Sequence, residues 1–182
     1  MKKLRPVRIL SVVSTLACLS LTGPLYAASV SWIGADAITW TYNPDEVDNA
    51  SATTAMVRAG IEYSDNFGVE THLALGGSDT VVINNNQVDV GLDGVWGVFF
   101  RAAYPISDAR IYGLVGASNL TMSVDAPQLS GADRITRLSY GAGAEYLVNQ
   151  NWVINADYMV YLHSESFTFS AISLGLRYRF LN

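Results

Sequence analysis

The sequence ends with ISLGLRYRFLN at residues 172–182. Side chains of a β-strand point alternately to opposite faces, so this stretch has an apolar face and a small or basic face. The apolar face carries Ile172, Leu174, Leu176, Tyr178 and Phe180, and the other carries Ser173, Gly175, Arg177 and Arg179. A soluble barrel turns its charges to water, whereas a transmembrane barrel turns them into its lumen. The direction of the two arginines therefore decides the class of protein.

The same period-two alternation recurs along the chain, and no segment keeps a helical period. Clear cases lie at residues 53–64, 67–76, 88–104, 137–148 and 152–163, and less clear ones at 29–42 and 110–124. Short polar turns at 64–66, 105–109 and 149–151 alternate with longer polar connections at 43–52, 77–87 and 125–136, and with a short one at 164–166. This pattern predicts an all-β fold, an eight-stranded antiparallel up-and-down transmembrane β-barrel.

The first segment breaks the simple pattern. We expect Asp36 to point inward, and its parity then takes Trp32 and Trp40 inward as well. Two large indoles on a polar face conflict with the pattern, so the sequence predicts a β-bulge in this strand.

The N-terminus has the features of an export signal. The basic start MKKLRPVR precedes a short apolar run, and cleavage is expected after Ala27 or one residue later. Cleavage after Ala27 gives a signal peptide at 1–27 and a barrel domain at 28–182. An uncleaved anchor helix and a lipoprotein signal cleaved before Cys18 are the alternatives. Cleavage would leave seven basic residues against sixteen acidic ones, and this balance excludes nucleic acid as a partner.

Aromatic residues and glycines decide between the two barrel orientations. Many aromatics of the apolar faces lie close to turns, where a membrane interface selects them. They are Tyr63, Phe67, Trp96, Tyr104, Tyr140, Tyr146, Trp152, Tyr158, Tyr178 and Phe180. The opposite faces are rich in glycine, which leaves room for long charged side chains in a narrow lumen. The sequence therefore predicts that the leucines face lipid and the arginines face the lumen.

The charges expected in the lumen have both signs. They are Arg58, Arg101, Arg137, Arg177 and Arg179, with Asp36, Glu62, Glu70, Asp89, Asp93, Glu145 and Asp157. Counting residues from the short turns places Glu70, Arg101, Glu145, Asp157 and Arg177 at similar heights. Together with Arg58 they form the predicted ion-pair network. Such a belt plugs a lumen just wide enough for side chains. A small gated pore, in which arginines and carboxylates exchange partners, is the alternative.

The chain also resembles the transmembrane domain of the OmpA family of small outer-membrane barrels. The resemblance rests on WIGADA, FGVE, FFRAAYPISDARIYGLVG, GAGAEYLVNQNWVINADY and ISLGLRYRF. It implies charged lumen residues at Glu70, Arg101 and Glu145. It further implies that the last strand, through Gly175, Tyr178 and Phe180, is read by the barrel assembly machinery, with periplasmic chaperones as further partners.

These observations predict a non-enzymatic integral protein of the outer membrane of a Gram-negative bacterium. We expect a monomer without cofactor or metal, in contact with outer-membrane lipids and lipopolysaccharide, where Arg134 and Arg137 could meet phosphates. A lipid A-modifying enzyme is the rival hypothesis, because His163, Ser164, Glu165 and Ser166 contain the three residue types of a hydrolase triad. Parity places His163 and Ser164 on opposite faces, which disfavours it.

Overall fold

The computed structural model describes residues 29–44, 49–83, 86–126, 129–164 and 167–181. The expected signal peptide at 1–27 lies outside these residues. The strands are β1 (Val30–Pro44), β2 (Ala50–Glu62), β3 (Phe67–Leu75), β4 (Ser78–Ile83), β5 (Asn86–Ile106), β6 (Ala109–Ala126), β7 (Leu129–Leu147), β8 (Trp152–His163) and β9 (Phe167–Phe180). Within the described residues, no helix is long and apolar enough to cross a membrane.

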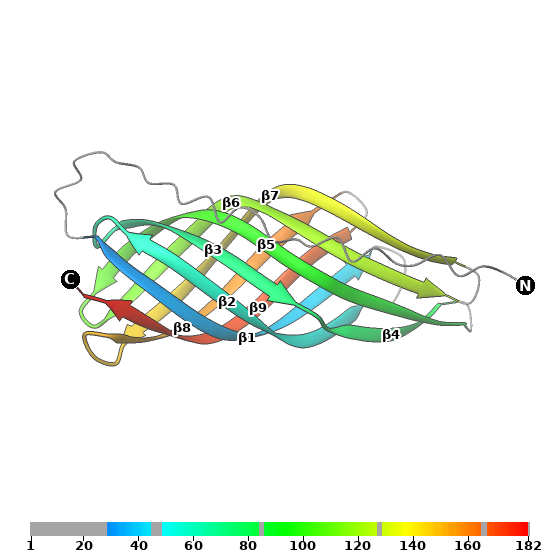
Figure 1. Cartoon of the computed structure of the whole chain (residues 1–182), viewed down its shortest axis with the longest axis horizontal. Helices are drawn as coiled ribbons and strands as arrows, with labels where there is room; N and C mark the ends of the chain where they lie inside the picture. The colour runs from blue at the N-terminus through cyan, green and yellow to red at the C-terminus, as the bar shows by residue number, and fades with distance from the viewer. Residues whose placement is uncertain (1–28, 45–48, 84–85, 127–128, 165–166, 182) are drawn as a thin grey trace, which may run out of the picture.

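The strands close into an eight-stranded antiparallel barrel (Figure 1), which confirms the predicted fold. Strand β1 pairs with both β2 and β9, so the first and last strands meet. Both β3 and β4 pair with β5, at successive stretches of it, and together they fill one position of the barrel.

Two glycines separate β3 from β4. Gly76 and Gly77 have φ angles of +82° and +102°, a region that other residues rarely adopt. A Cβ on Gly77 would also lie 2.9 Å from the indole nitrogen of Trp40. Glycine therefore allows both the break in the strand and the close approach of this indole.

The barrel has two different ends. At the turn end, the chain reverses within residues 63–66, 107–108 and 148–151. At the other end, here called the hairpin end, β4–β5 and β6–β7 continue as long ribbons (Figure 1). The prediction of polar connections at 77–87 and 125–136 was therefore wrong, because cross-strand pairing there runs to Ile83–Asn86 and Ala126–Leu129.

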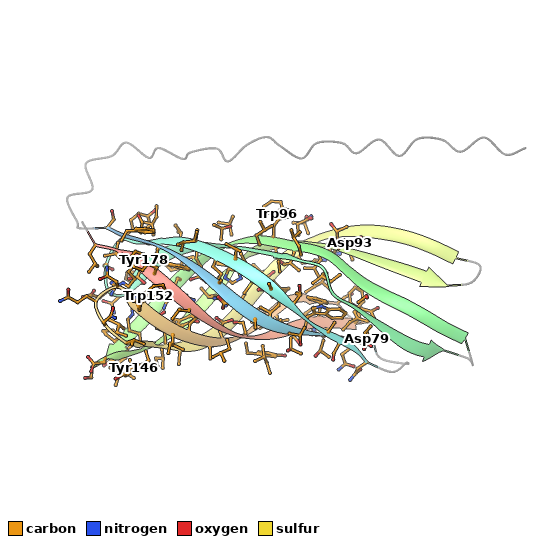
Figure 2. The ribbon with its side chains drawn as sticks, turned by 60° about the horizontal axis from the view of Figure 1, so that its bottom comes forward. Asp79, Asp93, Trp96, Tyr146, Trp152 and Tyr178 are labelled. Atoms are coloured by element: carbon orange, nitrogen blue, oxygen red, sulfur yellow. The ribbon has the colours of Figure 1, made fainter. Side chains whose placement is uncertain are left out.

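The outer face is apolar, as predicted. Leu174, Leu138 and Val98 are more than half exposed, and their neighbours Ser173, Ser139 and Phe99 are buried inside the barrel. Tyr146, Trp152 and Tyr178 all lie near the turn end in Figure 2, and the rings of Trp152 and Tyr178 are 5.0 Å apart. This face has the composition that contact with lipid requires.

The predicted bulge in the first strand was wrong. Strand β1 keeps a regular register against both neighbours, and Trp32, Asp36 and Trp40 all point inward. The lumen accepts the indoles because Trp32 lies where Gly60 has no side chain and Trp40 packs on Phe169 at 5.6 Å.

The bulges lie elsewhere, and they reverse two predicted faces. The register shifts between Leu92 and Gly94, so Leu92 points inward and Asp93 is exposed, the opposite of the prediction. A second shift between Val160 and Leu162 turns Leu162 inward. The carbonyl of the bulged Tyr161 accepts hydrogen bonds from Ser118 and Ser139 at 3.0 and 2.7 Å. These bonds satisfy a backbone group that the bulge removes from the cross-strand hydrogen bonding of the sheet.

Candidate functional site in the barrel lumen

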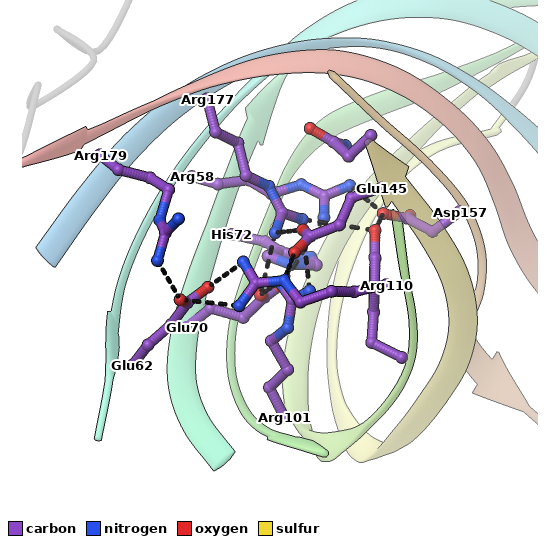
Figure 3. A network of polar contacts seen from close by, with 12 residues as sticks. Arg58, Glu62, Glu70, His72, Arg101, Arg110, Glu145, Asp157, Arg177 and Arg179 are labelled. Atoms are coloured by element: carbon purple, nitrogen blue, oxygen red, sulfur yellow. Dashed lines mark hydrogen bonds and ion pairs between the residues drawn. The ribbon is translucent and has the colours of Figure 1, made fainter. Parts of the chain in front are cut away.

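Arg58 lies at the centre of a polar cluster inside the barrel (Figure 3). Its Nη2 is 2.8 Å from Asp36 Oδ2 and 2.6 Å from Asp157 Oδ2, and its Nη1 is 3.4 Å from Glu70 Oε1. Four strands, β1, β2, β3 and β8, supply these groups. The guanidinium is fully buried, so the carboxylates replace the water that it loses.

Glu145 of β7 collects three arginines. Arg101 Nη2 and Arg177 Nη1 lie 2.8 and 3.0 Å from Oε2, and Arg110 Nε lies 2.5 Å from Oε1. Two of these cations also approach Glu70, at 3.5 Å from Arg101 and 3.9 Å from Arg177. Glu70 and Glu145 are therefore linked through shared arginines.

Glu62 forms the outermost part of the network, towards the turn end. Arg110 donates to both of its oxygens, from Nη1 at 3.0 Å and from Nη2 at 2.9 Å. Arg179 adds a third hydrogen bond at 3.3 Å. The bidentate pair fixes the orientation of the Arg110 side chain, whose Nε then reaches Glu145.

Neutral groups complete the cluster. Tyr112 donates to Asp157 at 2.7 Å, Ser173 to the same carboxylate at 2.7 Å, and Asn155 to Asp36 at 2.8 Å. The Tyr112 ring also lies below the Arg101 guanidinium, 3.9 Å from its centroid.

The charges of this network balance. Among the described residues, the ion pairs join five arginines to five carboxylates: Arg58, Arg101, Arg110, Arg177 and Arg179, with Asp36, Glu62, Glu70, Glu145 and Asp157. A ring of one sign would select ions, whereas paired charges of both signs fill the lumen without a net field.

His72 connects the polar network to an apolar layer on the side of the hairpin end. Its Nε2 lies 2.7 Å from Glu70 Oε1, and its Nδ1 lies 3.0 Å from the Tyr161 hydroxyl. Its ring packs on Phe99 at 4.4 Å. Towards the hairpin end, Ser118, Asn119 and Ser139 are buried, but most buried side chains are apolar. They include Ile38, Trp40, Met56, Val95, Phe99, Leu120, Met159, Leu162 and Phe169. The lumen therefore contains two layers, one ionic and one apolar.

The structure brings the six predicted network residues together, and three others from the wider prediction, Asp36, Glu62 and Arg179, join them. Sequence reasoning missed Arg110, His72 and Tyr112 as members. Arg110 and Tyr112 lie in the segment whose faces were unclear, although the parity of Arg110 with Leu114 and Ser118 would have placed it inward.

Two of the predicted lumen charges do not join the network. Arg137 is exposed and donates to the carbonyl of Thr136. Among the described side chains of β7, Ser139 is the last buried one in that direction, so the strand has passed the barrel rim at Arg137. Asp93 is exposed at its bulge. Asp89 and Arg134 lie outside the described side chains.

The comparisons with known proteins agree with this geometry. A model of the outer membrane protein beta-barrel domain matches residues 12–180. The chain belongs to this outer-membrane barrel family. The comparison with curated proteins finds no match.

Several solved structures share the fold of this outer-membrane barrel. The Ail attachment invasion locus protein of Yersinia pestis is 20% identical with a TM-score of 0.63, covering 84% of this chain and 99% of its own. Neisserial surface protein A is 16% identical with a TM-score of 0.62, covering 82% and 97%. OprG of Pseudomonas aeruginosa is 14% identical with a TM-score of 0.62, covering 86% and 97%.

Family membership fixes the orientation of the outer-membrane barrel. Such barrels have short periplasmic turns and longer extracellular loops. The turn end is therefore periplasmic and the hairpin end extracellular. The ionic layer lies in the periplasmic half of the lumen and the apolar layer in the extracellular half.

Two residues of the rival enzyme hypothesis, His163 and Ser164, lie at the extracellular rim. His163 is exposed, and its Nδ1 is 3.0 Å from Thr168 Oγ1. Glu165 and Ser166 lie outside the described residues. The part of the chain that the structure describes contains no group of three or more metal-ligating side chains placed to hold an ion.

Proposed function

We propose that this chain is a non-enzymatic structural barrel of the outer membrane, monomeric, with a closed lumen and with its long hairpins exposed at the cell surface. One observation carries the proposal: two layers of different chemistry fill the lumen in series. Ions and solutes would have to pass both.

The packing of the lumen supports closure. At the periplasmic mouth, Arg110 donates to both oxygens of Glu62, and its Nε lies 2.5 Å from Glu145 Oε1, so ion pairs occupy this end of the lumen. Deeper in the lumen, Trp40, Phe99 and Phe169 are fully buried. A water-filled path would require both the removal of charged pairs from each other and the wetting of apolar side chains.

The gated pore remains the second candidate, and one observation favours it. Arg177 Nη1 lies between Glu145 and Glu70, at 3.0 and 3.9 Å, so a small movement could exchange its partner. Such an exchange changes the ionic layer and leaves the apolar layer in place. We therefore rank the pore below the closed barrel.

Single-channel recording tests the proposal. Protein refolded in detergent would be added to a planar bilayer over a range of voltages, and its folded state checked by the gel shift between unheated and boiled samples. The expected result is a bilayer without steps of current. Reproducible current steps from the folded sample would overturn the closed barrel and support the pore.

The acidic residues at the extracellular end oppose the capture of polyanions. Ail has been solved in complex with a heparin analogue, sucrose octasulfate. The corresponding end of this chain includes the segment NPDEVDNASA at residues 43–52, which contains three acidic and no basic residues. We expect this end to repel sulfated polysaccharides. Retention on a heparin column at low ionic strength would contradict this expectation.

Absence of enzymatic activity has its own test. The variants His163→Ala and Ser166→Ala would be expressed in cells, and their lipid A analysed by mass spectrometry against cells with the unchanged chain and cells without it. The proposal expects identical lipid A in all four. A species that depends on the chain and disappears in either variant would support the enzyme.

A further inference from the structure

A groove of about 510 Å³ lies on the outer surface of the barrel, across β5, β6 and β7. Its lining includes Ala102, Tyr104, Ile111, Gly113 and Ala142, all exposed on the lipid-facing side. It begins close to the periplasmic turn at residues 107–108, because Tyr104 and Ile111 pair with each other three residues before and after that turn. The groove is therefore at the depth of the periplasmic leaflet.

The cross-strand register explains its shape. Ala102 is opposite Gly113, and Gly113 is opposite Ala142, so three small residues lie side by side on adjacent strands. Phe67 and Tyr158 lie at the two ends of this row, and both rings are about half exposed. The three small residues therefore form the bottom of the groove, and an aromatic side chain borders it at each end.

Larger side chains close the groove towards the extracellular side. The next row of outward-facing residues on the same strands consists of Phe100, Val115 and Tyr140, and each is close to half exposed. On the periplasmic side, Tyr104 and Ile111 are followed in the same row by Ala144. Small residues thus continue to Ala144, and Tyr146, the next outward-facing residue of β7, borders the groove on the periplasmic side.

We propose that this groove binds one acyl chain of a phospholipid from the periplasmic leaflet. The groove is continuous with the apolar band that already faces lipid, and Tyr104 and Tyr146 place its periplasmic side near the headgroups of that leaflet. Within a bilayer the hydrophobic effect does not distinguish the groove from bulk lipid, so the gain comes from contact on several sides at once. The inference does not depend on whether the lumen conducts.

A second copy of the chain fits the groove less well than a lipid chain. A stable protein interface buries on the order of 1,200–2,000 Å², which is more than a groove of a few residues offers. The surrounding ring of Phe67, Phe100, Tyr140 and Tyr158 would also hold another flat barrel wall away from the small residues.

The test fills the groove by the substitution Gly113→Leu. A Cβ at this position would meet its nearest atom, the carbonyl oxygen of Gly141, at an ordinary 3.9 Å, so the barrel can accept it. The matched control is Ala35→Leu, which enlarges an exposed alanine of β1 outside the groove. Ala142→Leu is a second groove variant should the first fail to fold, and folding is judged by the gel shift on boiling.

Native mass spectrometry would then count phosphatidylethanolamine molecules retained by each protein after refolding in detergent with this lipid. The expected result is one retained lipid on the unchanged chain and the control, with at least a ten-fold lower occupancy in the groove variants. Equal retention by all proteins would overturn the proposal. A dimer of the unchanged chain that the groove variants lose would also overturn it, in favour of a second copy.

Discussion

Arg58 and Asp157 meet across the barrel lumen, with Nη2 2.6 Å from Oδ2, although 99 residues separate them in the chain. The pair joins β2 to β8, which are not neighbours in the sheet. It is therefore a contact that exists only when the barrel has closed, and it makes the ionic layer dependent on correct closure.

Replacement of Arg58 by methionine should strongly destabilise the barrel. Asp36, Asp157 and Glu70 would lose a shared cation while remaining buried, and broken buried pairs cost about 3–5 kcal/mol. Urea-induced unfolding in lipid vesicles measures the effect. The control Arg137→Met removes an exposed arginine and should change the free energy of unfolding by about 0.5 kcal/mol or less. Equal effects of the two substitutions on the free energy of unfolding would show that the buried network does not stabilise the barrel.

The pair of Glu62 with Arg110 should show strong energetic coupling. A double-mutant cycle with Glu62→Gln and Arg110→Gln is expected to give about 1–3 kcal/mol, because two hydrogen bonds hold a nearly buried pair. The cycle with Arg179→Gln should give less, since that contact is a single one at 3.3 Å to a more exposed side chain. A larger coupling for Arg179 would contradict the assigned geometry.

Conductance should appear only when both lumen layers are altered. The substitutions Arg101→Met with Glu145→Gln weaken the ionic layer, and Phe99→Ala with Tyr161→Ala opens the apolar layer. Either pair alone should leave the bilayer silent, and the four together should give current steps, because the two seals act in series. Current from the first pair alone would show that the apolar layer does not seal the lumen.

The last strand gives a prediction about assembly in the cell. Phe180→Ser should lower the amount of folded protein in the outer membrane, if this aromatic is part of the signal that the assembly machinery reads. Leu181→Ser is the neighbouring control, since both side chains are close to half exposed. Refolding in vitro should be the same for both. If Phe180→Ser also refolds poorly in vitro, the residue acts through the stability of the barrel instead. Its ring packs against that of Tyr178 at 5.1 Å.

Particular residues show how far sequence reasoning reaches. The inward direction of Arg58, Glu70 and Arg177 followed from period-two alternation, which the backbone imposes locally. Leu92 and Leu162 were assigned to the wrong face because a bulge adds one residue and reverses the parity beyond it. Nothing in the alternation itself marks where such an extra residue falls.

The sequence by itself determined most of the strands and of their two faces, the lipid-facing surface and the presence of both charge signs inside, because these depend on local alternation. Only the tertiary structure decided the partners. Arg110 reaches Glu62 and Glu145, and His72 joins Glu70 to Tyr161, through the stagger of strands around a closed barrel. That stagger is a property of all eight strands together, so no single strand encodes which charges meet or where the ionic layer gives way to the apolar one.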